Sequence, residues 1–340
     1  MENGIITYIC GEKDEGVRLS DILKSRMNIF SSTLKRLKAH GGIFLNGENA
    51  HVNVTVKNGD TVRADLSAAE IPTLIPPEEP EPEIAYESES LLAVRKNAMS
   101  VVHPTCFHRT GTVAANVALY YRNRGIKAGI HLVNRLDLGT SGLLLFAKSG
   151  WAQEIMRREA EEGSYRKTYI GICDVTDYDG PCEEGFTETV DLPVARDLSS
   201  IIKRKVDPEG SRAVTVFRII AADRSRKRIL AAFSLLTGRT HQIRVHMSHI
   251  GLPLTGDTLY SPLYMTGREE GPTERARSET QDGHQPHQLL HHYQRGCDDP
   301  LSGVRTVVSC PAPEEFTELF PGCFSGGLLL PPYARYLFPL

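Results

Sequence analysis

One carboxylate in this 340-residue sequence has neighbours suited to chemistry. Asp137 follows Arg135 by two residues, and the turn Gly139-Thr140-Ser141 then leads into an apolar run at 142–147. This layout predicts a single carboxylate, with a cation beside it, at the edge of a sheet. Such a group is ionised at neutral pH, because its ordinary pKa is about 4 and a guanidinium favours the charged form. An ionised carboxylate can attack an electrophilic carbon and leave again, which is covalent catalysis without a cofactor. The alternative is a turn residue that only accepts hydrogen bonds from backbone amides.

A second group of polar residues lies further along the chain. The run at 237–247 reads T-G-R-T-H-Q-I-R-V-H-M. Its apolar residues recur at helical spacing, which predicts a helix over 240–250 with one buried face. His241 and Arg244 share another face that can line a cleft. The helix N-terminus also offers backbone amides to an anion.

Both runs resemble the signatures of a known enzyme family. Residues 131–143, H-L-V-N-R-L-D-L-G-T-S-G-L, are similar to the motif H-R-L-D-x-x-T-S-G-L of the RluA-type pseudouridine synthases. Residues 237–246 are similar to that family's motif T-G-R-x-H-Q-[IL]-R-V-H. The resemblance implies that Asp137 is the nucleophile that isomerises uridine in RNA. It also implies that Arg244 is the arginine that pairs with this carboxylate.

A third match lies in a predicted strand at 167–174. The family's K-x-Y is matched at Lys167-Thr168-Tyr169, and the resemblance implies that Tyr169 stacks on the target base. Such stacking is worth about 1–3 kcal/mol, whereas a strand tyrosine taken alone is more often core packing. Weaker matches extend the resemblance over about residues 17–320. Two motifs are altered: the usual K-P-x-G is here K-N-A-M at 96–99, and the usual R-Q-A-L-H-A is H-Q-L-L-H-H at 287–292.

A small basic module precedes these motifs. Residues 17–66 carry eight Lys/Arg and four Asp/Glu. The predicted elements are a helix at 17–27, a helix at 32–40, a strand at 43–45 that ends in the turn Asn46-Gly47, and a strand with alternating Val52, Val54 and Val56. This order resembles the S4 RNA-binding domain. The resemblance implies that Lys35, Arg36 and Lys38 of the second helix grip RNA phosphates. The alternative is a small α/β module with a solvated basic helix.

Composition divides the rest of the chain. The stretch 67–90 holds seven Glu and no Lys or Arg, and five prolines lie within 67–83. These residues predict a stiff, extended, unpacked linker. We therefore expect an N-terminal segment at 1–16, an S4-like module at 17–66, the linker at 67–83, a catalytic domain at 84–322 with a loose insertion at 263–288, and an apolar tail at 323–340.

The resemblance implies an α+β fold. An S4-like α/β module would precede a pseudouridine synthase catalytic domain built on a mixed, largely antiparallel sheet. No apolar run approaches the ~20 residues that span a bilayer, and the N-terminus lacks a signal pattern, so we expect a cytoplasmic protein. Seven cysteines without a C-x-x-C pair predict free thiols. The His-rich stretch at 284–297 fits no zinc pattern, and we expect no metal, no cofactor, no obligatory protein partner and a monomer.

The sequence thus predicts isomerisation of specific uridines in structured RNA, either ribosomal or transfer RNA, with the target base flipped out of its stack. Arg135 would fill the vacated space or hold a phosphate, and Arg239 and His241 would contact RNA. The S4-like module favours large-subunit ribosomal RNA. Two other functions are less consistent with the sequence. A pure RNA-binding relative should lack Asp137 or Arg244, and a glycosidase needs a second carboxylate that neither core motif supplies.

Overall fold

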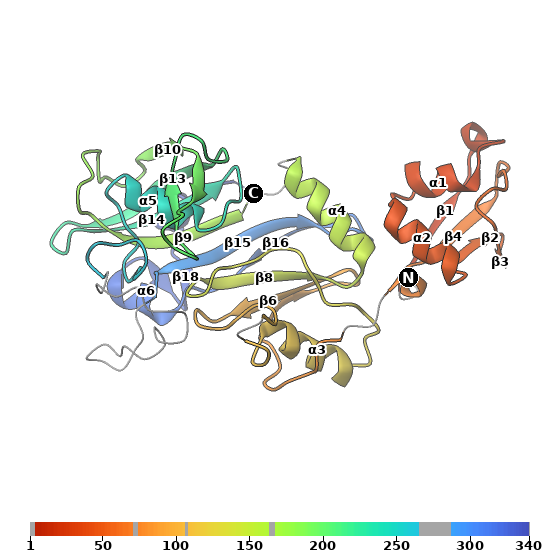
Figure 1. Ribbon diagram of the computed structural model, residues 1–340, viewed down its shortest axis with the longest axis horizontal. Helices are drawn as coiled ribbons and strands as arrows, with labels where there is room; N and C mark the ends of the chain where they lie inside the picture. Colours follow the sequence, from red (N-terminus) through yellow and green to blue (C-terminus); the bar gives the residue numbers. More distant parts are fainter. Residues whose placement is uncertain (1–3, 71–73, 106–107, 163–166, 265–286, 340) are drawn as a thin grey trace.

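The computed structural model describes residues 4–70, 74–105, 108–162, 167–264 and 287–339. It consists of a small N-terminal module and a larger domain, which lie at opposite ends of the long axis (Figure 1). Most of the insertion expected at 263–288 lies outside the described residues. Among the described helices, none is long and apolar enough to span a membrane.

Short strands and two helices form the N-terminal module. The strands make one antiparallel sheet in the order β1-β4-β2-β3, and both helices bury an apolar face against it. The elements are β1 (Ile5–Ile9), α1 (Leu19–Ser25), α2 (Ser31–Ala39), β2 (Ile43–Leu45), β3 (Glu48–Asn49) and β4 (Thr61–Asp65), with the 3-10 turns η1 (Glu12–Asp14) and η2 (Leu66–Ala69).

Two expectations about this module were wrong. β1 pairs with β4 along its whole length, so residues 5–9 belong to the sheet of the module and not to a separate segment before residue 17. The local sequence pattern did not predict this pairing because the partner strand lies at the far end of the module. Val52 and Val56 are buried and Val54 is exposed, but this stretch is irregular and makes only an isolated bridge at Thr55. The alternation therefore reflects packing of a loop and not a strand.

A large mixed sheet is the framework of the second domain. Its order is β10-β13-β14-β9-β15-β8-β6-β5, with β16 added to β15 and β7 added to β8. Among the described strands of this sheet, only β15 and β8 pair in parallel, which confirms a largely antiparallel sheet. The strands are β5 (Ile84–Glu87), β6 (Leu91–Lys96), β7 (His131–Leu132), β8 (Ser141–Ala147), β9 (Lys167–Asp174), β10 (Thr187–Asp191), β13 (Val214–Asp223), β14 (Arg228–Leu235), β15 (Leu290–Asp298) and β16 (Arg305–Ser309).

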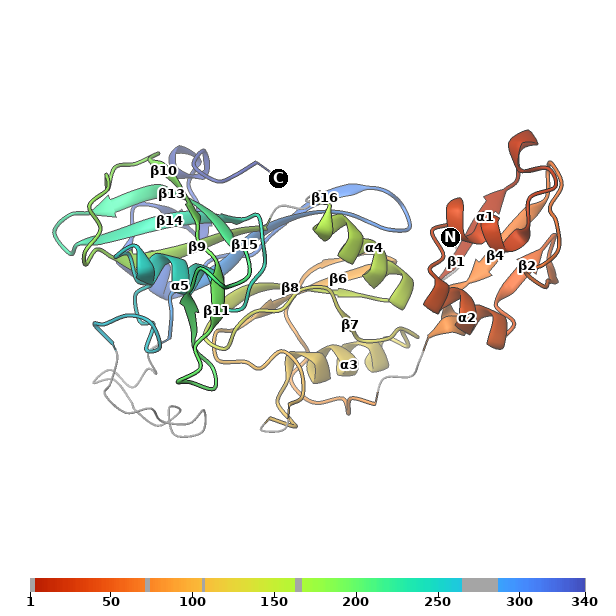
Figure 2. The same ribbon diagram turned by 45° about the horizontal axis from the view of Figure 1, so that its top comes forward.

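The sheet is covered on both faces because its central strands alternate between two apolar cores. On β8, Leu144 and Phe146 pack with α3 (Val113–Asn123), whereas Leu143 and Leu145 pack with α4 (Gly150–Glu161). Figures 1 and 2 show α3 and α4 on opposite sides of the strands. The remaining elements are α5 (Gln242–His249) on the α3 face, α6 (Glu314–Leu319) with β17 (Phe324–Ser325), β18 (Leu328–Leu329) and α7 (Pro331–Ala334) on the other face, and the hairpin β11 (Val194–Arg196) and β12 (Arg204–Val206).

The acidic linker is packed, contrary to expectation. The Glu78 carboxylate accepts a hydrogen bond from the Gly111 amide at 2.5 Å, and the Glu78 carbonyl accepts one from Asn116 of α3. Glu81 forms an ion pair with Arg124 at 2.8 Å. The linker therefore follows α3, because donors on and beside that helix bind its glutamates.

The N-terminal module contacts the larger domain at the start of α4. Trp151 donates its indole hydrogen to the Asn28 carbonyl at 3.0 Å. The Glu70 carboxylate binds His131 of β7 at 2.6 Å and accepts the Gly150 amide at 2.9 Å. One acidic side chain thus connects the module both to α4 and to the strand that leads to Asp137.

Candidate active site

Asp137 lies in the loop between β7 and β8. Leu136 is buried and Thr140 donates its amide to the Asp137 carbonyl at 3.1 Å, so the backbone turns at this position. A Cβ at Gly139 would collide with the Gln288 side chain, and Gly139 has φ +85°, so this position requires glycine. The Asp137 side chain is 31% exposed, and its carboxylate makes no hydrogen bond within the described part of the chain.

Two buried side chains, Lys96 and Gln288, bind the backbone of this loop. The Lys96 ammonium, at the end of β6, donates to the carbonyls of Asn97, Ala98 and Thr140 at 3.0, 2.8 and 2.6 Å. Burial lowers the pKa of Lys96 to about 7, and the nearby Asp137 charge acts in the opposite direction. The Gln288 amide donates to the Leu138 carbonyl and the Thr140 hydroxyl. Sequence reasoning noted Lys96 only as part of an altered motif and gave it no role.

His241 lies opposite the Asp137 carboxylate, with its Nε2 4.0 Å from Oδ2. It precedes α5 as the N-cap and has φ +58°, a left-handed conformation rare outside glycine. The Tyr260 hydroxyl accepts the Arg204 amide and lies 2.8 Å from His241 Nδ1. We assign the hydroxyl as the hydrogen-bond donor to Nδ1, and this tautomer carries its ring hydrogen on Nε2, which faces Asp137. Burial lowers the pKa of His241 to about 4, so the ring is neutral at pH 7.

The turn before α5 is held by one glutamine. The Gln242 side chain accepts the Arg239 amide at 2.9 Å and the Thr237 hydroxyl at 2.8 Å, and donates to the Val214 carbonyl at 3.0 Å. The bond to the Arg239 amide satisfies a backbone donor of the turn, and the bond to the Val214 carbonyl connects the turn to β13. The turn is thereby held in the conformation that gives His241 its left-handed backbone and directs its side chain to the site.

Arg244 points at a different carboxylate from the one expected. Its Nε and Nη2 bind the two oxygens of Asp257 at 2.7 and 2.8 Å, and both side chains are buried. The expected pairing with Asp137 is therefore wrong for this state of the protein. The reason is that Asp257 offers a buried, bidentate partner, which is the stronger geometry for a guanidinium. Burial lowers the pKa of Arg244, and the charges of Asp257 and then Asp137 more than offset this. Arg244 thus still lies within the field of Asp137.

Tyr169 projects from β9 on the same face of the sheet as Leu136. It is 6% exposed, and within the described residues its hydroxyl makes no hydrogen bond. Burial raises its pKa, Arg295 lowers it and the Asp137 charge raises it further. The structure therefore brings Asp137, Tyr169, Arg244 and His241 together at one place on the α3 face.

The predicted RNA-contacting residues lie in different surroundings. Arg135 is exposed on the Asp137 loop, and Arg239 lines a hollow of about 310 Å³ together with Arg196 and Arg204. On α2, Lys35 and Lys38 are exposed. Arg36 is only half exposed, and its Nη1 would be 3.9 Å from a Cβ at Gly150. Arg36 therefore faces the junction with the catalytic domain as well as solvent.

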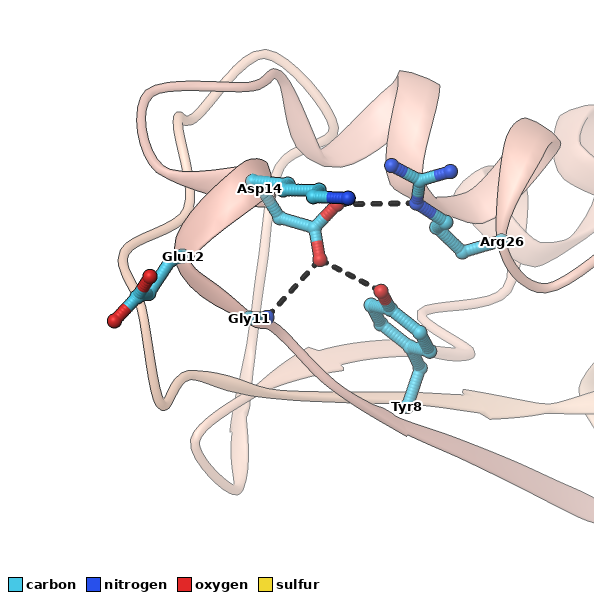
Figure 3. Close-up of a pocket in the computed structure, with 6 residues that line it drawn as sticks. Tyr8, Gly11, Glu12, Asp14 and Arg26 are labelled. Carbon is cyan, nitrogen blue, oxygen red and sulfur yellow. Dashed lines mark hydrogen bonds and ion pairs between the residues drawn. The ribbon is translucent and has the colours of Figure 1, made fainter.

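A second hollow lies in the N-terminal module, beside Asp14 (Figure 3). The Asp14 carboxylate accepts hydrogen bonds from the Tyr8 hydroxyl at 2.6 Å, the Gly11 amide at 3.0 Å and Arg26 Nε at 3.1 Å. The Tyr8 hydroxyl is the largest cause that lowers the pKa of Asp14. This carboxylate is used to hold the β1–α1 connection together.

Comparisons with known proteins agree on one family. The model of the family "RNA pseudouridylate synthase" matches residues 90–249. The uncharacterised RNA pseudouridine synthase YhcT of Bacillus subtilis is 35% identical over 75% of this chain and 82% of its own length. The ribosomal large subunit pseudouridine synthase D of Pseudomonas aeruginosa is 36% identical over 69% of each chain. Among solved structures, human RNA pseudouridylate synthase domain containing 4 has a similar fold, with a TM-score of 0.52 and 20% identity over 69% of this chain and 90% of its own.

Proposed function

The chain belongs to the RluA-type family of RNA pseudouridine synthases, isomerases that convert uridine to pseudouridine in RNA, and we propose that its reaction begins at the Asp137 carboxylate. One observation carries the proposal. Asp257, the other carboxylate of the site, is fully buried and its oxygens are bound by Arg244 and by the amides of Leu259 and Tyr260. Asp137 is partly exposed and has no hydrogen bond from the described residues, so it is the carboxylate available to a substrate.

The target uridine must leave its stack to reach Asp137. A carboxylate in a surface loop cannot contact a base inside a helix, so the nucleotide turns out into the site at a cost of a few kcal/mol. Arg135 lies on the same loop, two residues before the nucleophile, and is exposed. It occupies the vacated space or holds a neighbouring phosphate.

The reaction rearranges bonds within one nucleotide. Attack by Asp137, either on the base or on the sugar C1′, leads to cleavage of the glycosidic bond between C1′ and N1. The uracil then turns within the site and its C5 bonds to C1′. C5 loses its proton, N1 gains one, and the carboxylate leaves unchanged. These steps involve no change of oxidation state.

The neighbours of Asp137 have separate roles. The Tyr169 ring stacks on the uracil and keeps it in place while it turns. His241 presents a neutral N–H to the carboxylate and so orients it without forming a fixed ion pair. Arg244 is fixed by Asp257, and its positive charge attracts the negative charge of Asp137.

Large-subunit ribosomal RNA is the substrate that we favour over transfer RNA. The relative from Pseudomonas aeruginosa is named a ribosomal large subunit enzyme, which supports this assignment. The N-terminal module, which we assign as S4-like, adds Lys35 and Lys38 as phosphate contacts. Arg239 extends the basic surface on the side of the active site.

The test is to map pseudouridine in total RNA from cells with and without this protein. Deletion strains are complemented with the wild type, with Asp137→Asn, or with Asp14→Asn as a control that alters a carboxylate outside the site. We expect particular sites in large-subunit ribosomal RNA to disappear on deletion and to return with the wild type and with Asp14→Asn. Return of all sites with Asp137→Asn would contradict the role of this carboxylate. Loss confined to transfer RNA would contradict the substrate assignment.

A further inference from the structure

His292 lies directly behind Tyr169. Their rings are stacked, with centroids 4.6 Å apart and an angle of 19° between the planes. His292 is on β15 and faces Tyr169 across the ladder to β9, where the two residues pair directly. No other aromatic ring stacks on Tyr169 among the described residues. One face of the Tyr169 ring is therefore covered by a second flat ring.

The imidazole is fixed in its plane. His292 is 0% exposed, and its Nδ1 donates a hydrogen bond to the Leu143 carbonyl at 2.7 Å. Leu143 belongs to β8, the strand that begins just after the Asp137 loop. His292 consequently connects the strand that follows the nucleophile to the strand that carries Tyr169.

Close backbone packing holds this connection. A Cβ at Gly142 would collide with the backbone of His292, and Gly142 has φ +111°, so only glycine fits here. The two residues pair in the parallel ladder between β15 and β8. The ladder to β9 shifts register between His292 and Gln294, which is a bulge. Bulges redirect side chains, and this one lies at the residue that backs Tyr169.

A histidine is a costly choice at this position. Its Nε2 is buried without a hydrogen-bond partner in the described structure, which an apolar side chain would avoid. The motif R-Q-A-L-H-A that residues 287–292 resemble ends in alanine, so the imidazole distinguishes this chain from that pattern. Burial lowers the pKa of His292 far below its ordinary value, so the ring is neutral. A neutral, flat ring that a hydrogen bond holds in place can support a second ring stacked on it.

We propose that His292 is a positioning residue that holds the Tyr169 ring in the plane in which it stacks on the target uracil. This inference rests on the proposed role of Tyr169. Without His292, the ring of Tyr169 could tilt into the space behind it, and fewer encounters would present the uracil correctly to Asp137. The effect therefore falls on the rate of the chemical step and not on the affinity for RNA, most of which comes from phosphate contacts.

The experiment uses full-length protein and an RNA fragment that contains the mapped site. Single-turnover rates and RNA dissociation constants are measured for His292→Ala, His292→Leu and His292→Phe. Since an aromatic pair contributes a factor of about three to ten, we expect His292→Ala to lower the rate by roughly that factor with an unchanged dissociation constant. His292→Phe should restore most of the rate. His292→Leu fills the space without a flat ring and should restore less. Equal rates for the Leu and Phe variants would overturn the proposal.

The matched control is Ile170→Ala. Ile170 is fully buried beside Tyr169 on β9 but faces the opposite core, so its loss destabilises the same sheet without touching the ring. We expect Ile170→Ala to unfold at a lower temperature but to keep the single-turnover rate. A rate loss equal to that of His292→Ala would mean that His292 acts only through stability.

Two further measurements test whether His292 acts through Tyr169. In a double-mutant cycle, His292→Ala should cost no additional rate in a Tyr169→Leu background, whereas additive losses would contradict the proposal. By NMR of labelled tyrosine, the Tyr169 ring should flip faster in His292→Ala than in the wild type. The NMR result needs no RNA, so it can refute the positioning role even if the wild type forms no pseudouridine, an outcome that would refute the proposed function separately.

Discussion

Asp14 and Asp137 are two aspartates in loops, and the protein treats them in opposite ways. Asp14, in the N-terminal module, is buried and accepts hydrogen bonds from a hydroxyl, an amide and a guanidinium (Figure 3). Asp137, in the catalytic domain, is partly exposed, and its Oδ2 lies 4.0 Å from His241 Nε2. Both carboxylate oxygens of Asp14 already accept hydrogen bonds, whereas those of Asp137 remain available.

This difference separates a carboxylate that stabilises from one that can react. A buried polar group is satisfied by its own fold, because leaving it without partners costs about 1–3 kcal/mol. The protein keeps Asp137 in place by another route: Lys96 and Gln288 bind the backbone of its loop and leave the side chain free. The geometry of the loop is thus fixed without a bond to the Asp137 carboxylate.

The largest expected effect comes from Asp137→Asn. The variant should lose about 10³-fold or more in single-turnover rate, because the amide cannot act as a nucleophile. Its free energy of unfolding should stay within about 0.5 kcal/mol of the wild type, because the carboxylate makes no hydrogen bond to lose. Urea denaturation and pseudouridine formation on the same preparation check this. A variant that is inactive and also strongly destabilised would show that Asp137, like Asp14, stabilises the fold.

Asp257 allows the same comparison, between a stabilising carboxylate and an available one, within the catalytic domain. Asp257→Asn removes the charge that balances buried Arg244, and breaking such a pair costs about 3–5 kcal/mol. The control is Asp174→Asn, which breaks a pair with Arg228, whose side chain is 25% exposed. We expect the control to cost clearly less free energy of unfolding in urea. Equal losses would show that burial of the Arg244 pair does not decide its strength.

The residue that faces Asp137 gives a pH test. The pKa of His241 is lowered to about 4 by burial, while an unfolded histidine has a pKa near 6.5. The unfolded state therefore binds more protons between these values, so this contribution to stability is complete above pH 6.5 and is lost as the pH falls to 4. At about 1.4 kcal/mol per pKa unit, the loss is about 3 kcal/mol. The stability difference between the wild type and His241→Gln should fall by this amount over that range, and a flat difference would contradict the burial of a neutral ring.

The sequence predicts the elements that carry Asp137 and Tyr169 better than it predicts the contacts between distant side chains. The loop of Asp137 and the strand of Tyr169 have local signals, a glycine turn beside an apolar run and a K-x-Y strand, and β9 has the predicted bounds. The partner of Arg244 has no such signal. From the sequence, Asp137 and Asp257 are both possible salt-bridge partners of Arg244, and only the folded geometry decides between them. The stack of His292 on Tyr169 also depends on strand order, which local patterns do not encode.

The same limit applies to the N-terminal module. Its helices were predicted from apolar spacing, and the ends of α2 lie within two residues of the expected bounds. The pairing of β1 with β4 and the contact of Glu70 with His131 join distant parts of the chain. Long-range contacts of this kind follow from which surfaces fit together, so residue types and spacing did not reveal them.

A smaller effect is expected from Asp14→Asn. The variant keeps the shape of the side chain but loses the charge that binds Arg26, so its thermal midpoint should fall while the rate of pseudouridine formation stays unchanged. Because its hydrogen bonds lower the pKa of Asp14, the stability it contributes is present above the unfolded pKa of about 3.9 and is lost as the pH falls further. The gap in thermal midpoint between variant and wild type should therefore narrow below pH 4. An unchanged midpoint at pH 7 would mean that the network is not stabilising.

The smallest effects should come from the module's own unpartnered groups. Lys35 and Lys38 are exposed on α2 and make no ion pair within the described residues, so both cations remain available to a ligand. If each contacts one phosphate, replacing both with alanine weakens RNA binding and lowers the magnitude of the slope of log K against log salt by about 1.5–2. Lys57→Ala, which removes one positive charge from a loop outside α2, should change the slope by less than Lys35→Ala does on its own. Equal slopes for all variants would show that α2 does not contact RNA. The single-turnover rate at saturating protein should be the same throughout, because these lysines act on encounter and Asp137 acts on chemistry.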